Sequence, residues 1–174
     1  MAKLRKACAY RSIERPYTRR SKFREKSYIK AMPNSKVVRY DMGNLSKRFA
    51  HTIDLVSKDS LQIRHNAIES ARLAANRVLE GAVSKVGFNL RIRIYPHHIL
   101  RENPLASGAG ADRMSTGMKM SFGKPIGSAA RVKEGQVLFT ASVDKSNINL
   151  AKQALKKAAY KLPCACQVIE RAAA

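Results

Sequence analysis

Acidic side chains are scarce in this 174-residue sequence, and tryptophan is absent. Twelve Asp and Glu residues face 34 Lys and Arg residues, which gives a formal net charge of +22. Self-repulsion at this charge destabilises a compact chain unless a polyanion lies nearby. An ordinary neutral enzyme is therefore excluded, and a nucleic acid is the expected partner. A basic protein that binds a membrane surface is the weaker alternative.

Cysteine and long apolar runs are also in short supply. The three cysteines, Cys8, Cys164 and Cys166, are too few and too unevenly placed for a disulfide scaffold. No apolar run approaches the roughly 18–20 residues that a membrane-spanning helix needs. The basic N-terminus is not followed by the apolar segment of a secretory signal. We therefore expect a cytoplasmic protein in a reducing compartment, with no membrane partner.

The positive charge is concentrated near the N-terminus, where residues 1–30 hold eleven Lys and Arg residues and two Glu residues. The apolar residues here follow no helical or strand period, so we expect residues 1–30 to be poorly ordered in the absence of a partner. They belong to a basic, RNA-binding extension that we expect to cover 1–35. Aromatic residues alternate with the cations, which makes both phosphate pairing and base stacking available. A solvated tail that aids solubility is the alternative. The candidate RNA-binding residues of this extension are Lys3, Arg5, Lys6, Arg11, Arg15, Tyr17, Arg19, Arg20, Lys22, Arg24 and Lys26.

From residue 36 onward the pattern becomes that of one folded domain, 36–174. Extended, β-like segments are predicted at 36–40, 51–56, 88–95, 129–133, 136–143 and 164–169. Glu134 and Gly135 match a two-residue turn that would join the fourth and fifth segments as a hairpin. Helical spacing predicts one helix over 63–82 and another that follows Asp144 or Ser146 as its cap and ends at Pro163. The expected fold class is α+β, a two-layer sandwich of two helices on a mixed or antiparallel sheet.

The segment 88–95 alternates most clearly, with Phe88 and Leu90 on the face that also carries Ile92 and Ile94. Arg91 and Arg93 share the opposite face with Tyr95. These two arginines are a candidate phosphate-facing patch, and a merely solvated face is the alternative.

Residues 97–128 follow no regular period and hold five of the nine glycines. A loop of this length is usually functional or disordered. Glycines permit close backbone approach and methionines make adaptable apolar contacts, so we expect a functional loop that inserts into a crowded RNA environment.

Catalytic and metal-binding motifs are incomplete. Gly117 and Gly123 are one residue too far apart for a phosphate-binding P-loop, and Pro125 replaces the hydroxyl that would bind magnesium. The two thiols of 164–166 have no second Cys or His pair at zinc spacing, so they are interpreted as core residues. No nucleophile has a base and an orienting partner. We expect no enzyme activity, no cofactor, no metal and no small-molecule substrate.

Four short stretches carry a recognisable pattern: 109–113 (AGADR), 116–119 (TGMK), 121–125 (SFGKP) and 130–132 (ARV). They resemble the signature of a universal large-subunit ribosomal protein family, called L-ten-e in archaea and eukaryotes and L-sixteen in bacteria. The resemblance extends over nearly the whole chain and looks archaeal. It is supported by 15–19 (RPYTR), 68–72 (IESAR), 91–96 (RIRIYP) and 158–163 (AAYKLP).

The resemblance implies a structural, non-catalytic component of the large ribosomal subunit that supports translation and joins the subunit late in assembly. The implied partners are large-subunit rRNA near the aminoacyl-tRNA site, tRNA in the aminoacyl and peptidyl sites, and neighbouring ribosomal proteins. A loop at about 101–116 would reach toward the tRNA acceptor ends near the peptidyl-transferase centre. The implied tRNA-proximal residues are Arg101, Gly108, Gly110, Asp112, Arg113, Thr116, Gly117, Lys119, Phe122, Gly123 and Lys124.

Two other function classes compete with this interpretation. A nucleic-acid chaperone or DNA compactor would explain the charge but not the loop motif. A stand-alone RNA-modifying enzyme would need a cofactor site or a catalytic pair. If the ribosomal interpretation holds, deleting 1–30 should greatly weaken RNA binding, while excising 102–115 should impair translation and leave binding nearly intact.

Overall fold

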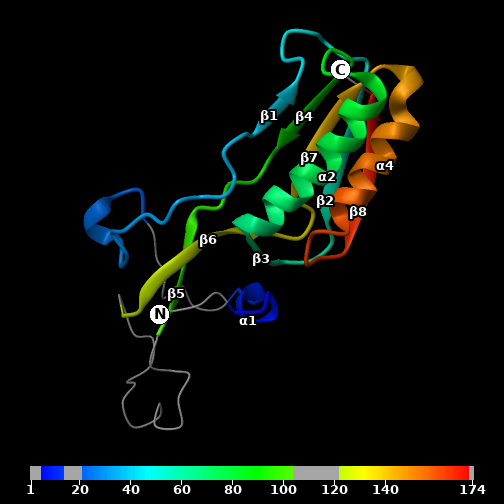
Figure 1. The fold of residues 1–174 in the computed structure, drawn as a ribbon. Coiled ribbons are helices and arrows are strands. Elements are labelled where there is room, and N and C mark those ends of the chain that lie inside the picture. Colours follow the sequence, from blue (N-terminus) through cyan, green and yellow to red (C-terminus); the bar gives the residue numbers. More distant parts are fainter. Residues whose placement is uncertain (1–4, 14–20, 104–121, 173–174) are drawn as a thin grey trace.

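The computed structural model describes residues 5–13, 21–103 and 122–172 (Figure 1). Its helices are α1 (Cys8–Arg11), α2 (His65–Val83) and α4 (Ile148–Ala159), with the short 3-10 turns η1 (Arg24–Lys26) and η2 (Lys145–Asn147). Its strands are β1 (Asp41–Gly43), β2 (His51–Ser57), β3 (Leu61–Arg64), β4 (Phe88–Ile92), β5 (His98–Glu102), β6 (Lys124–Val132), β7 (Val137–Val143) and β8 (Cys166–Ala172).

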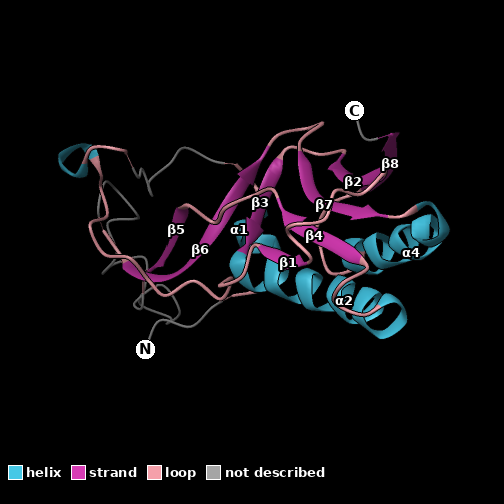
Figure 2. Cartoon of the chain, turned by 90° about the horizontal axis from the view of Figure 1, so that it is seen from above, coloured by secondary structure: helices cyan, strands magenta, loops and turns pink. Residues whose placement is uncertain are grey.

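The larger sheet has five strands in the order β1-β4-β7-β2-β8, and every neighbouring pair is antiparallel. Helices α2 and α4 lie side by side on one face of this sheet (Figure 2). Their inner faces are made of small side chains, so the helices approach the strands closely. The fully buried alanines of these faces are Ala71, Ala75, Ala151, Ala154 and Ala158. The structure confirms the α+β two-layer sandwich and shows that its sheets are antiparallel.

The smaller sheet has the order β3-β6-β5 and is also antiparallel. The C-terminal part of β6 pairs with β3, and the N-terminal part pairs with β5. β3 leads directly into α2, which joins this sheet to the two-layer core. β5 and the start of β6 continue as a two-stranded ribbon that runs away from α2 and α4 (Figure 1).

Several predicted boundaries are wrong. Residues 36–40 form no strand, and β1 instead covers Asp41–Gly43. Residues 61–64 pair with β6, so α2 begins at His65 rather than at residue 63. The predicted loop 97–128 contains β5 and the first part of β6. Backbone pairing between β5 and β6 makes these residues strands. The spacing of apolar residues within either segment alone does not reveal that pairing.

The predicted hairpin at Glu134 and Gly135 is a turn between two sheets. Gln136 N–H donates to the Lys133 carbonyl at 3.2 Å, and Gly135 has a φ of +76°, so the tight turn is present. However, β6 pairs with β3 and β5, whereas β7 pairs with β2 and β4. The turn therefore carries the chain from one sheet to the other.

The predicted cap of the second long helix is also absent. Neither Asp144 nor Ser146 is the N-cap of α4, which follows Asn147 without a side-chain cap bond. The Asp144 carboxylate instead accepts a 2.7 Å hydrogen bond from Lys47 Nζ.

Candidate RNA interface

Residues 5–13 dock on the smaller sheet. Tyr10 of α1 is 8% exposed and packs against Leu100 of β5 and Ala129 of β6. Its hydroxyl donates a 2.6 Å hydrogen bond to Glu102 Oε1. Burial, followed by this hydrogen bond, raises the pKa of Tyr10 to about 12. The expectation of a poorly ordered extension is wrong for this part of it.

Arg5 holds the same carboxylate from a second direction. Its Nε lies 3.1 Å from Glu102 Oε2. Arg64 Nη1 donates to the Arg5 carbonyl at 2.9 Å, and Gln62 Nε2 donates to the Tyr10 carbonyl at 3.1 Å. Because its charge is paired with Glu102, Arg5 is better suited to anchoring residues 5–13 on the smaller sheet than to binding phosphate.

Glu102, Gln62 and Arg64 are anchoring residues that the sequence pattern does not single out. Gln62 and Arg64 alternate with apolar residues in β3, and Glu102 is the last residue of β5. Their shared task depends on β3, β5 and α1 meeting in space.

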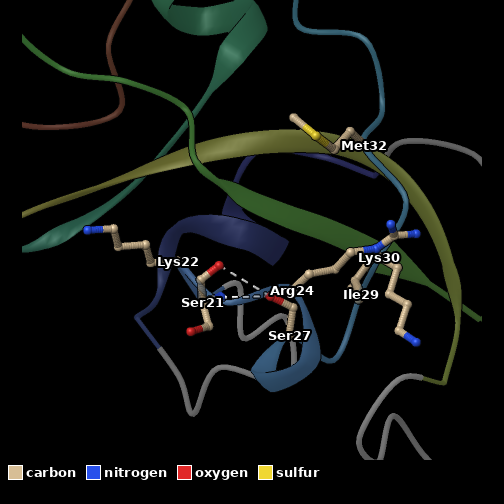
Figure 3. Close-up of a pocket in the computed structure, with 7 residues that line it drawn as sticks. All are labelled: Ser21, Lys22, Arg24, Ser27, Ile29, Lys30 and Met32. Carbon is tan, nitrogen blue, oxygen red and sulfur yellow. Dashed lines mark hydrogen bonds between the residues drawn. The ribbon is translucent and has the colours of Figure 1, made fainter.

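Residues 21–32, here called the basic turn, form a second cationic surface (Figure 3). Ser21 N–H donates to Ser27 Oγ at 2.9 Å, which closes the segment around η1. Lys22 points to one side of this serine pair, and Arg24 and Lys30 point to the other (Figure 3). The three cations line a hollow of about 340 Å³ and are exposed. This arrangement suits the phosphates of an RNA backbone.

The other predicted cations of the extension that the structure describes are also on the surface. Lys6 and Arg11 are exposed before and at the end of α1. Lys26 Nζ lies 5.1 Å from the centre of the Phe23 ring, and that ring is 62% exposed. An exposed aromatic face beside a cation can stack on an unpaired base.

The predicted patch on β4 is present, but part of it is already paired. Arg91, Arg93 and Tyr95 are exposed on one face. Arg91 forms an ion pair with Asp41 of β1. Tyr95 stacks on Tyr40 with 5.6 Å between ring centres. Arg93 is therefore the residue of this patch best placed to meet a phosphate.

The β5–β6 ribbon forms the base of the glycine-rich loop. Arg101 pairs with Pro125 and Glu102 pairs with Lys124 across the two strands. Arg101 is 5% exposed, and its Nη1 donates to the Phe122 carbonyl at 2.5 Å. Arg101 therefore fastens the base of the loop. Phe122 and Lys124 are exposed at the ribbon's end, and Gly123 between them has a φ of +106°.

Many of the predicted site residues lie outside the described part of the chain. In the extension these are Lys3, Arg15, Tyr17, Arg19 and Arg20. In the loop they are Gly108, Gly110, Asp112, Arg113, Thr116, Gly117 and Lys119.

His65, at the first position of α2, is buried beside β6 of the smaller sheet. Lys36 N–H donates to His65 Nδ1 at 3.3 Å, so this nitrogen accepts and the ring is neutral. Ser128 Oγ lies 3.1 Å from the same nitrogen. Burial, and then the charges of Lys36 and Arg64, lower the pKa of His65.

The cysteine pair fits the core interpretation. Cys164 and Cys166 are half-buried against the main core, with 3.5 Å between their sulfur atoms. A hydrogen bond from Cys166 lowers the pKa of Cys164 to about 7 and raises that of Cys166. Over residues 5–13, 21–103 and 122–172, no three His, Cys, Asp or Glu side chains gather as a metal site. No helix in the same ranges is long and apolar enough to cross a membrane.

Comparison with known proteins decides the family. The model of the family described as ribosomal protein L16p/L10e matches residues 14–169. A protein of Methanococcus maripaludis named large ribosomal subunit protein uL16 is 48% identical over 167 residues, which cover 95% of this chain and 93% of the relative. Proteins of the same name are 45% identical in Methanocella arvoryzae and 43% identical in Methanoculleus marisnigri. These two alignments cover 92% and 94% of this chain, and 90% and 94% of the respective relatives.

The chain belongs to the ribosomal protein L16p/L10e family. Membership confirms the resemblance drawn from the loop motif, and the methanogen relatives confirm its archaeal character. The matched span contains the basic turn, the β4 arginines and the β5–β6 ribbon.

Proposed function

We propose that this chain is a structural, non-catalytic component of the large ribosomal subunit that binds large-subunit rRNA near the aminoacyl-tRNA site. Its working place is the cytoplasmic ribosome, where neighbouring ribosomal proteins are its other partners. Membership of the L16p/L10e family is the observation that carries this proposal. The net charge of +22 agrees with it, because most of the affinity of such a protein for RNA comes from phosphate neutralisation.

In this proposal the loop that connects β5 to β6 reaches toward the acceptor ends of tRNA near the peptidyl-transferase centre. The chain joins the subunit late and shapes that centre. The ribbon supports the assignment because the Arg101 side chain and the antiparallel pairing of β5 with β6 give the loop a rigid base.

The basic turn is the proposed main phosphate contact among the described residues. Replacing Lys22, Arg24 and Lys30 together with alanine should lower the slope of log affinity against log salt by about two units, at roughly 0.7–0.9 per phosphate contact. The measurement is a titration of deproteinised large-subunit rRNA with the full chain at several salt concentrations. Replacing Lys145, Lys156 and Lys157 with alanine is the matched control. These three lysines are also exposed, but they lie on η2 and α4, outside the basic turn.

Competition with duplex DNA in the same titration separates the ribosomal function from a general nucleic-acid chaperone. The proposal predicts that rRNA displaces DNA at equal nucleotide concentration. Equal binding of the two would contradict it.

The loop is tested by a deletion that spares its base. Excision from residue 102 would remove Glu102 and undock Tyr10, so the deletion should start after Asn103 and cover 104–115. We expect rRNA affinity within about twofold of the full chain, together with impaired translation by reconstituted ribosomes. If this deletion abolished subunit assembly, the assignment of separate roles to extension and loop would be wrong.

A further inference from the structure

Cys164 and Cys166 flank Ala165 where the chain enters β8 after α4. Their sulfur atoms lie 3.5 Å apart, and both side chains are half-buried, so each keeps part of its surface in contact with solvent. Cys8, the third cysteine of the sequence, is exposed on α1. Two thiols that already touch need only a short movement to form the S–S bond of about 2.0 Å in a disulfide.

The backbone around the pair is held by the turn that follows β2. Cys166 lies opposite Ser57 in the antiparallel register of β8 and β2. Ala165 N–H donates to Asp59 Oδ2 at 3.0 Å, and Lys58 N–H donates to the Ala165 carbonyl at 2.9 Å. Because these bonds fix the residue between the two cysteines, the folded chain keeps their sulfur atoms close together.

The surroundings of Cys164 favour its thiolate form. A hydrogen bond from Cys166 is the largest influence on the pKa of Cys164. It acts against burial, is reinforced by a hydrogen bond from Ser57, and brings the pKa to about 7. Of the charged groups that face this thiol, Asp59 raises its pKa and Arg11 lowers it. The pKa of Cys166 is raised by the same hydrogen bond, so the pair presents one thiolate beside one thiol.

We propose that Cys164 and Cys166 form a reversible oxidation site, at which a peroxide converts the two thiols into a disulfide. The Cys164 thiolate attacks one peroxide oxygen, the O–O bond breaks, hydroxide leaves, and Cys164 becomes a sulfenic acid. The Cys166 sulfur then attacks the Cys164 sulfur, and the S–O bond breaks. The departing oxygen leaves as water with the proton of Cys166. The two sulfur atoms lose two electrons in total, and hydrogen peroxide is reduced to two water molecules.

A thiol reductant returns the site to the dithiol by exchange. This inference goes beyond the proposed binding of rRNA and does not depend on it.

Mild treatment of the full chain with hydrogen peroxide, followed by alkylation, trypsin digestion and mass spectrometry, tests the proposal. Both cysteines fall in one tryptic peptide, 162–171, and Cys8 falls in another, 7–11. We expect peptide 162–171 to lose about 2 Da, to escape alkylation and to recover both thiols in dithiothreitol. Because the thiolate is the reacting form, the rate of bridge formation should rise about tenfold between pH 6 and pH 8.

Two variants separate the bridging sulfur from the hydrogen bond. Cys166→Ser keeps a donor beside Cys164 but removes the second sulfur, so oxidation should stop at a sulfenic acid that dimedone labels. Cys166→Ala removes the donor as well. Its sulfenic acid should form about fivefold more slowly at pH 7, because the thiolate fraction falls more than the nucleophilicity of the thiolate rises.

Cys8→Ser is the matched control, and it should form the bridge at an unchanged rate. Thermal unfolding checks that each variant is folded.

The proposal is overturned if peroxide that oxidises Cys8 leaves Cys164 and Cys166 open to alkylation, or if Cys164 of the unaltered chain stops at the sulfenic acid. Equal rates of bridge formation in the folded chain and in concentrated urea would also overturn it, because the folded geometry would then contribute nothing. The rRNA titration is a separate measurement. A chain that prefers rRNA but forms no bridge loses only this inference, and a chain that forms the bridge without preferring rRNA loses only the proposed function.

Discussion

The docking of Tyr10 should contribute measurably to the stability of the chain. In Tyr10→Phe the ring stays buried against Leu100 and Ala129, and the change removes the hydroxyl that donates to Glu102 at 2.6 Å. Glu102 keeps its ion pair with Arg5 at 3.1 Å, so its charge is not left alone. The hydroxyl also accepts a 3.2 Å hydrogen bond from the Arg5 backbone N–H, so the substitution removes two hydrogen bonds, of which the one to the carboxylate is the stronger.

A hydrogen bond to a charged group contributes about 1.5–3 kcal/mol. Because Arg5 still neutralises Glu102, we expect the lower end, about 1.5 kcal/mol. For a chain of this length that loss lowers the melting temperature by about 3–6 °C. Tyr28→Phe is the control, since Tyr28 is 42% exposed and its substitution should stay within about 0.5 kcal/mol.

Urea unfolding of the two variants and the unaltered chain at pH 7.5 measures the difference, and a repeat at high pH tests its cause. The pKa of Tyr10 is raised in the folded chain to about 12, so its contribution is complete below pH 10 and disappears as the pH rises through 12. The difference in free energy of unfolding between the unaltered chain and Tyr10→Phe should therefore be complete below pH 10 and disappear as the pH rises through 12. A loss below about 0.5 kcal/mol at pH 7.5 would refute the docking of α1 through Glu102.

Two further predictions concern His65 at the start of α2 and the edge of the larger sheet. Because the pKa of His65 is lowered on folding, the unfolded chain takes up the proton first as the pH falls below about 6.5. Stability should fall below that pH by up to about 1.4 kcal/mol per unit, and urea unfolding of His65→Gln should show a flatter profile. Gly43→Ala should destabilise by at least about 2 kcal/mol, because φ is +86° and the new Cβ would lie 2.1 Å from the Phe88 carbonyl oxygen. In Gly81→Ala, within α2, the new Cβ meets nothing within 4 Å, so this substitution should stabilise the chain by about 0.5–1 kcal/mol. Thermal melts that rank the two glycine variants in the opposite order would contradict the β1–β4 register.

Elements that carry their own periodicity could be predicted from the sequence. Ala71, Ala75 and Leu79 repeat on one helical face, and α2 buries that face. Phe88, Leu90 and Ile92 alternate with polar residues, and β4 buries the apolar set. In both cases local spacing and burial agree.

Elements that depend on a partner strand could not be predicted. β3 and β5 are short, and each exists because β6 lies beside it. The turn at Glu134 and Gly135 was recognisable, but its role in joining two sheets depends on which strands flank β6 and β7.

The same distinction between local pattern and long-range contact applies to the candidate RNA interface. Runs of Lys and Arg predicted a cationic surface, and the basic turn provides one. The pairing of Arg5 with Glu102, of Arg91 with Asp41 and of Arg101 with a backbone carbonyl joins residues far apart in the chain. Sequence position alone therefore could not tell which cations serve as anchors.

Sedimentation of a cell lysate through a sucrose gradient at moderate salt, with detection of this chain, tests the central claim most directly. The proposed ribosomal function predicts co-migration with the large subunit and the complete ribosome, and loss of that co-migration after digestion with RNase. A slowly sedimenting peak, or one that follows DNA, would contradict the proposed ribosomal function.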